Sequence, residues 1–300
     1  MPLTRRNFER ALALPFCGAA SGLPAPAAPA PSRASYVESL ELFDSDVYLG
    51  PRLLDAERPI IGPPLLTAGD MLRELDHYGI REALLFHSAA KAGADPTANR
   101  QLLDAIRKAG SARQRLHACW SIVPGPDHRL PGPERVLADL ANHGLRAARV
   151  FPFNHQYRLQ DLGEIPAALA ERRVPLLVDF GITMPHHDRT DWNAVEWLLR
   201  QHPRLDLVLC HPPSRQNHRI FALMELSRRF HLSTAGFRIH QEVFAMARLF
   251  GAESIIYGSH LPYYTAAAPI AEIVYSELSE AEQKQIAGGA LRSLLGSAKP

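Results

Sequence analysis

Short apolar runs alternate with longer amphipathic segments along most of the chain. The runs are rich in Leu, Val and Ile and have the length of buried strands. They occupy residues 40–47, 81–87, 115–122, 145–151, 174–180, 205–211, 229–234 and 253–259. Between the runs, apolar residues recur every three or four positions, which predicts amphipathic helices. The chain is therefore expected to repeat a strand followed by a helix about eight times.

Three of the expected helices carry boundary signals in the sequence. One begins after Thr67 and ends at Gly79. Another begins with Pro133 and ends at Gly144, and a third begins after Asp191 and ends before a proline. Side-chain caps, a proline in the first turn and a glycine after the last turn are the residues that helix ends prefer.

The alternation of strand and helix predicts the fold class. It is typical of a (β/α)8 TIM barrel or of a long doubly wound sheet. No Gly-rich loop of the G-x-G-x-x-G or G-x-x-x-x-G-K type follows an expected strand, which weakens the case for a nucleotide-binding sheet. We therefore expect an α/β chain in which residues 36–300 form one (β/α)8 barrel.

Residues 1–35 differ in kind from the rest of the chain. They begin with TRRNF at residues 4–8, continue through a weakly apolar stretch, and end in an Ala/Pro-rich tail with possible A-x-A cleavage sites near Ala28 and Ala30. This order resembles a twin-arginine export signal, so we expect transport by the twin-arginine machinery to the periplasm or the medium. A disordered basic leader is the alternative. The apolar stretch is too short to span a bilayer.

Charge and cysteine content serve mainly to exclude partners. The chain has 33 Lys and Arg against 31 Asp and Glu, a formal net charge of +2. Without a long basic run, it has no charge pattern for nucleic acid or an anionic membrane, so the expected partner is a small-molecule substrate. Cys17, Cys119 and Cys210 lack C-x-x-C spacing, which argues against a zinc knuckle or a disulfide framework.

Most of the expected strands end in polar side chains, at the end of the barrel where this fold places active sites. In strand order these residues are Asp44, Asp46 and Tyr48; His87; Trp120 and Ser121; Arg149, Asn154 and His155; Asp179; His211; Thr234 and Arg238; and Ser259 and His260. Buried carboxylates are costly unless they are paired, hydrogen-bonded or metal-bound. Together these residues predict a constructed site, although each alone could cap a helix or bind a loop amide.

The first strand carries three of these side chains at alternate positions. Alternate residues of a strand share a face. We therefore expect Asp44, Asp46 and Tyr48 to point in the same direction.

The motifs resemble, in content and order, those of the amidohydrolase superfamily. They are LELFDSDVYLG, LRAARVFPFN, VPLLVDFG, HPRLDLVLCHPP, FHLSTAG and IIYGSHLPYY, and the similarity spans residues 40–296. The similar branch of metal-dependent hydrolases includes aminocarboxymuconate semialdehyde decarboxylase and pyrone dicarboxylate lactonase. The resemblance implies hydrolysis or decarboxylation of a small organic acid, lactone or amide, and it allows a homodimer.

The chain departs from the family at the metal site. The family pattern is D-x-H-x-H on the first strand, a histidine ending the fifth and the sixth strands, and G-S-D-x-P on the eighth. Asp44 matches the leading aspartate, and His211 matches the sixth-strand histidine, which handles the substrate. Asp46 and Tyr48 stand where the pattern has the two metal histidines of the first strand. Asp179 stands in place of the fifth-strand histidine, and His260 stands in place of the final aspartate.

Two hypotheses follow for the reaction centre. In one, Asp46, Asp179 and His260, with or without His211, hold one zinc, manganese or iron ion. In the other, no metal is bound or it binds only weakly, which the sequence favours because Tyr48 is not a default metal ligand.

The metal-free hypothesis assigns acid–base roles to the same residues. His260 would pair with Asp46 or Asp179 as a general base, and His211 would polarise or protonate the substrate. The expected substrate-binding residues are Arg149, which would hold a carboxylate, and Tyr48, His87, Trp120 and Arg238. The alternative to an enzyme is a non-catalytic barrel that binds a ligand or partner.

Overall fold

The computed structural model describes residues 33–51, 65–181, 189–213, 216–237 and 239–300. The twin-arginine motif lies outside these residues, so export stays a prediction. Residues 33–35, at the end of the predicted leader, begin helix α2 (Arg33–Ser39). In the described part of the chain, no helix has both the length and the hydrophobicity needed to cross a membrane.

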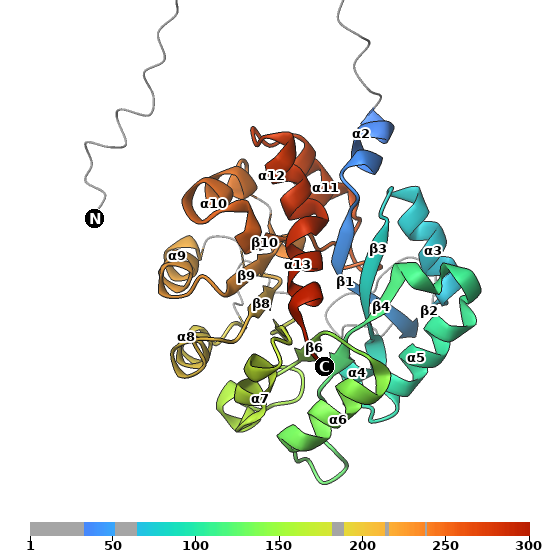
Figure 1. The fold of residues 1–300 in the computed structure, drawn as a ribbon, viewed down its shortest axis with the longest axis vertical. Coiled ribbons are helices and arrows are strands. Elements are labelled where there is room, and N and C mark those ends of the chain that lie inside the picture. Colours follow the sequence, from blue (N-terminus) through green and yellow to red (C-terminus); the bar gives the residue numbers. More distant parts are fainter. Residues whose placement is uncertain (1–32, 52–64, 182–188, 214–215, 238) are drawn as a thin grey trace, which may run out of the picture. The chain divides into compact units, whose positions relative to one another are not determined.

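Parallel strands form the centre of the structure, and helices lie outside them (Figure 1). The strands are β1 (Phe43–Pro51), β3 (Glu82–His87), β4 (Leu116–Ala118), β5 (Trp120–Ser121), β6 (Ala148–Val150), β7 (Leu176–Asp179), β8 (Leu207–Cys210), β9 (Phe230–Ser233) and β10 (Ile255–Ile256). A short antiparallel strand, β2 (Leu65–Leu66), pairs with the end of β1. The ladders run in the orders β2-β1-β3-β4 and β10-β9-β8-β7-β6-β5.

Two junctions join these ladders into a closed barrel. At the first junction β4 and β5 follow each other in the chain: Cys119 N donates to Leu85 O of β3 at 2.8 Å, and the next residue, Trp120, donates through N to Ala147 O beside β6 at 2.9 Å. At the second junction β1 meets the segment after β10, where Ser45 N donates to Tyr257 O at 3.0 Å and Tyr48 N donates to Leu261 O at 3.1 Å. The predicted (β/α)8 architecture is confirmed.

Helices follow the strands where the sequence pattern placed them. The helices after α2 are α3 (Ala68–His77), α4 (Ser88–Gly93), α5 (Ala98–Lys108), α6 (Pro133–His143), α7 (Ile165–Glu171), α8 (Trp192–Gln201), α9 (Asn217–Leu226), α10 (Glu242–Phe250), α11 (Ala267–Val274), α12 (Glu280–Lys284) and α13 (Ala290–Ser297). Thr67 and Asp70 form a capping box at α3, and Asp191 caps α8. Gly144 ends α6 in a left-handed conformation. The predicted boundary residues thus act as expected.

The barrel has two separate apolar layers. A large cluster packs the outer faces of the strands against the surrounding helices. A smaller cluster inside the barrel joins Leu177, Val208 and Ile256 to Leu291 and Leu295 of α13. These side chains and α13 fill the barrel interior away from the C-terminal ends of the strands. The polar residues therefore lie at the C-terminal ends.

A β-bulge in β1 breaks the alternation that the sequence predicted. The register with β3 shifts between Asp44 and Val47, so that Asp44 lies opposite Ala83 and Tyr48 lies opposite Phe86. Ala83 belongs to the outer apolar layer. The extra residue therefore places Asp44 on the outer face, while Tyr48 stays on the inner face. The expectation that Asp44, Asp46 and Tyr48 share one face is wrong for Asp44.

Gly258 allows the close approach that completes the barrel. A Cβ atom at this position would lie well inside van der Waals contact of Ser233 Oγ and 2.9 Å from Ser45 Oγ. These neighbours belong to strands on either side of β10, so neither side can yield without disturbing a ladder. A side chain here would overpack a closed interior.

We expect Gly258→Ala to lower the free energy of unfolding by about 1–3 kcal/mol, the usual cost of overpacking. Urea denaturation would measure it. Gly296→Ala in α13 is the control, because a Cβ there meets no atom within 4 Å. Equal stability of the two variants would contradict this account of the barrel closure.

Candidate functional site

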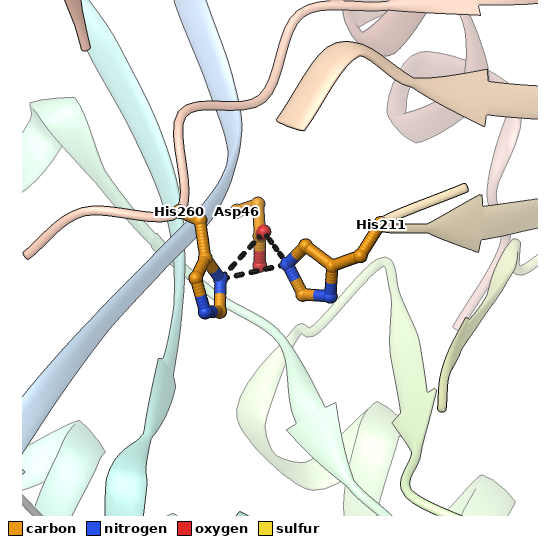
Figure 2. A group of neighbouring side chains, drawn as sticks. All are labelled: Asp46, His211 and His260. Carbon is orange, nitrogen blue, oxygen red and sulfur yellow. Dashed lines mark hydrogen bonds and ion pairs between the residues drawn. The ribbon is translucent and has the colours of Figure 1, made fainter. Parts of the chain in front are cut away.

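Asp46, His211 and His260 converge at the C-terminal end of the barrel (Figure 2). Asp46 comes from β1, His211 directly follows β8, and His260 lies in the turn after β10. His211 Nε2 lies 2.5 Å from Asp46 Oδ2 and 2.7 Å from His260 Nδ1. His260 Nδ1 lies 2.9 Å from Asp46 Oδ2. Three polar groups that are far apart in the sequence therefore meet at one buried point.

Both histidines of this cluster have unusual backbone conformations. His211 has a φ of 51° and His260 a φ of 63°, in the left-handed region that residues with a Cβ rarely adopt. Each one ends its strand and turns the chain sharply. Residues held in such conformations are concentrated at functional sites.

Arg149 and Asp179 form a second group behind the cluster. Arg149 Nη2 donates to Asp46 Oδ1 at 2.7 Å and to Asp179 Oδ2 at 2.6 Å. Its guanidinium group lies 4.0 Å from the centre of the Phe86 ring. Asp179 Oδ1 lies 3.3 Å from His211 Nδ1 and accepts from Gly181 N at 2.7 Å. Arg149 thus bridges two protein carboxylates through Nη2, whereas the sequence analysis had expected it to hold a substrate carboxylate.

Lys91 is a contact that the sequence analysis missed. It lies in α4, directly after β3, and its Nζ is 3.2 and 3.4 Å from the two oxygens of Asp179. A single lysine in a short helix on the active-site end of the barrel was the available signal. Such a residue is usually solvated, and only the tertiary structure brings it to a buried carboxylate.

The ionisation states follow from burial and from these neighbours. Burial alone would raise the pKa of Asp46 and of Asp179, but nearby cationic groups hold each pKa well below its ordinary value. Burial lowers the pKa of His211, and the two carboxylates reverse this and leave it raised. Burial and the neighbouring His211 lower the pKa of His260 to about 3. At neutral pH His260 is therefore a neutral imidazole beside the ionised carboxylate of Asp46.

Asp44 holds the site together from outside. Its Oδ1 accepts from Asp46 N and from Ser259 N, both at 3.0 Å. Burial raises the pKa of Asp44 to about 7, and the hydrogen bonds from Ser259 and Asp46 partly oppose that shift. The carboxyl group thus ties β1 to the turn that carries His260.

Tyr48 lies beside the cluster, as the sequence analysis expected for a substrate-pocket residue. Its ring centre is 5.4 Å from that of His260 and 5.1 Å from those of Phe86 and Tyr263. The hydroxyl group is buried and has no hydrogen-bond partner among the described residues. Tyr48 therefore gives the cluster an aromatic wall with an unsatisfied polar tip.

The other expected substrate-binding residues lie elsewhere. His87 caps α4, where its Nδ1 accepts from Ala89 N at 3.3 Å. Trp120 points to the helix layer and stacks on His143 of α6, with ring centres 5.7 Å apart. Arg238 lies outside the described residues. In the structure His87 caps a helix and Trp120 packs against one. The sequence could not show this, because the position of a residue at a strand end does not fix the direction of its side chain.

The donor atoms of the cluster fit one divalent metal ion. A carboxylate with two imidazoles is a ligand set that suits iron, manganese or zinc. Asp179 behind His211 and Arg149 behind Asp46 are the supporting contacts that metal-binding side chains receive. This set contains Asp46, His260 and His211, which the sequence prediction had allowed as a ligand, and it leaves out the predicted Asp179. Asp179 lies behind His211, where Arg149 and Lys91 neutralise it.

Comparison with known sequences identifies no relative. No family model matches the chain, and no curated protein matches it significantly.

Comparison with solved structures finds the same barrel. The chain is similar to 5-carboxyvanillate decarboxylase from Sphingomonas paucimobilis (17% identity, 86% of this chain and 99% of that one, TM-score 0.65). It is also similar to a dihydroxybenzoic acid decarboxylase from Polaromonas with bound manganese (16% identity, 85% of this chain and 96% of that one, TM-score 0.66). A third similar structure is that of a protein assigned as a 2-pyrone-4,6-dicarboxylic acid hydrolase from Pseudomonas putida (18% identity, 86% of this chain and 98% of that one, TM-score 0.61). The chain shares the fold of these proteins over nearly their whole length.

We expect Arg149→Met to destabilise the protein by about 3–5 kcal/mol, because it leaves two buried carboxylates without their common cation. Guanidinium denaturation would measure the change. The control is Arg248→Met, which removes an exposed pair with Glu282 and should change stability far less. If the two variants lost the same stability, Arg149 would not be the cation on which the buried carboxylates depend.

Proposed function

We propose that this chain is an enzyme of the amidohydrolase superfamily that decarboxylates or hydrolyses a small organic acid. The observation that carries the proposal is the convergence of Asp46, His211 and His260 at the C-terminal end of the barrel. Enzymes of this fold place their catalytic residues there. The structural neighbours act on 5-carboxyvanillate, on dihydroxybenzoic acid and, by assignment, on 2-pyrone-4,6-dicarboxylic acid, which supports this reaction class.

In the metal-free arrangement, His260 is the proposed proton-transfer residue. Its Nε2 is buried and has no partner among the described residues, and its low pKa keeps the ring neutral. A neutral imidazole with a free nitrogen can take a proton from water or from a substrate hydroxyl. In hydrolysis that proton passes to the leaving oxygen as water adds to the carbonyl carbon. In decarboxylation it passes to the carbon that loses CO2.

His211, Asp179 and Arg149 position the reacting groups. Asp179 fixes the His211 ring through Nδ1, and Arg149 fixes the carboxylate of Asp46. Because these contacts hold the side chains in fixed positions, little reorganisation is needed when charge develops on the substrate.

We propose that one divalent ion completes this site, held by Asp46, His211 and His260. Manganese, zinc and iron are the candidates. When bound, such an ion supplies a Lewis acid for a carboxylate or carbonyl oxygen. The metal-free hypothesis, which the sequence favoured, keeps the same residues as acid–base groups and is the alternative outcome of the test.

Activity can be tested by screening hydroxybenzoic acids for CO2 release and lactones for ring opening, with manganese or zinc added. We expect turnover that falls about 100-fold or more in His260→Ala, since acid–base groups contribute factors of that size. His143→Ala on α6 is the control, because this histidine is exposed and stacks on Trp120. Turnover that survives His260→Ala unchanged would remove His260 from the mechanism. Ligand binding without turnover would instead favour the non-catalytic barrel.

Elemental analysis of protein purified without chelator distinguishes the two ligand sets. We expect about one equivalent of metal per chain, lost in His211→Ala. Asp179→Asn should retain the ion with about 10–100-fold weaker affinity, the usual effect of losing a supporting contact. Metal that persists in His211→Ala and is abolished in Asp179→Asn would favour the set predicted from sequence.

A further inference from the structure

Lys91 is a partly exposed cation in contact with a buried carboxylate of the site. Its ammonium group contacts both oxygens of Asp179, which is 0% exposed, while the Lys91 side chain remains 19% exposed. Arg149, the other cation on the same carboxylate, is only 1% exposed and is shared with Asp46. Of these two cations, Lys91 is the one that solvent and an incoming molecule can reach.

The helix that carries Lys91 is fixed on both sides. His87 caps α4 through Ala89 N, and His155 Nε2 lies 2.8 Å from Ala90 O. Ala90 is buried in an apolar cluster with Phe86 and Phe151. The backbone before Lys91 is therefore anchored to the barrel, and the lysine side chain extends from a fixed point into the site.

Charge makes this position important for an acidic substrate. Asp46 and Asp179 are ionised, so a carboxylate that approaches them meets repulsion unless a cation lies between. An ammonium group has three N–H donors, and the two oxygens of Asp179 are within reach of two of them. Among the described residues Lys91 Nζ has no other hydrogen-bond partner, so its third donor can serve a ligand.

We propose that Lys91 binds the carboxylate of the substrate and shares its ammonium group between that carboxylate and Asp179. This assignment rests on the proposed function, which makes the substrate an organic acid. It makes Lys91 a residue that selects for acids over neutral analogues. Arg149, which the sequence suggested for this role, instead keeps the buried carboxylates paired.

The test compares two probes that differ only by a carboxylate, 2,6-dihydroxybenzoate and resorcinol. Isothermal titration calorimetry would measure both with the wild type and with Lys91→Met. We expect Lys91→Met to weaken binding of 2,6-dihydroxybenzoate about 10–100-fold, the size of a charge-assisted hydrogen bond, and to leave resorcinol unchanged. Lys91→Arg should recover part of the loss. The control is Lys108→Met, at the exposed end of α5.

Several outcomes would overturn the assignment. An equal loss for both probes would make Lys91 a structural residue, and no loss for either would remove it from the site. A wild type that fails to bind 2,6-dihydroxybenzoate at millimolar concentration would also count against it. Turnover of an acid with a KM that is unchanged in Lys91→Met would overturn the role of Lys91 and leave the proposed function intact. Binding of 2,6-dihydroxybenzoate that depends on Lys91, without turnover of any acid, would support the role of Lys91 and contradict the proposed function.

Discussion

The burial of two carboxylates, Asp46 and Asp179, is the constraint on which this active-site region depends. Each would be costly alone in the barrel interior. Arg149 neutralises both through one nitrogen atom, and Lys91 and His211 complete the pairing. The side chains of Asp46 and Asp179 are therefore held in place by charge as well as by packing. Such fixed charged groups are what the proposed electrostatic stabilisation of a substrate requires.

The contacts that close the barrel also bring the residues of the site together. The last ladder contacts run between β1 and the segment after β10, which carry Asp46 and His260. Asp44 spans this junction, and the bulge in β1 makes that possible by turning Asp44 outward while Asp46 faces inward. A change that opens this junction would separate Asp46 from His260, which the proposed site needs together.

The departures from the amidohydrolase pattern compensate one another. Where the pattern has a fifth-strand histidine the chain has Asp179, and this added negative charge is met by Lys91 and Arg149. Where it has a final aspartate the chain has His260, which contacts Asp46 from the opposite side of the barrel junction. The result is one carboxylate and two imidazoles around one point, in the same fold as decarboxylases of 16–17% identity.

The sequence alone determined the barrel and the end of it that carries the polar residues. Hydrophobic periodicity and caps such as Thr67 and Asp191 are local signals, and they specify elements and their order. The sequence could not determine which polar strand ends meet, because that depends on side-chain direction. The bulge at Asp44, the left-handed turns at His211 and His260, and the reach of Lys91 across to Asp179 exist only when distant segments pack together. Only the tertiary structure decided these contacts, since each is fixed by partners that lie from about thirty to more than two hundred residues away in the chain.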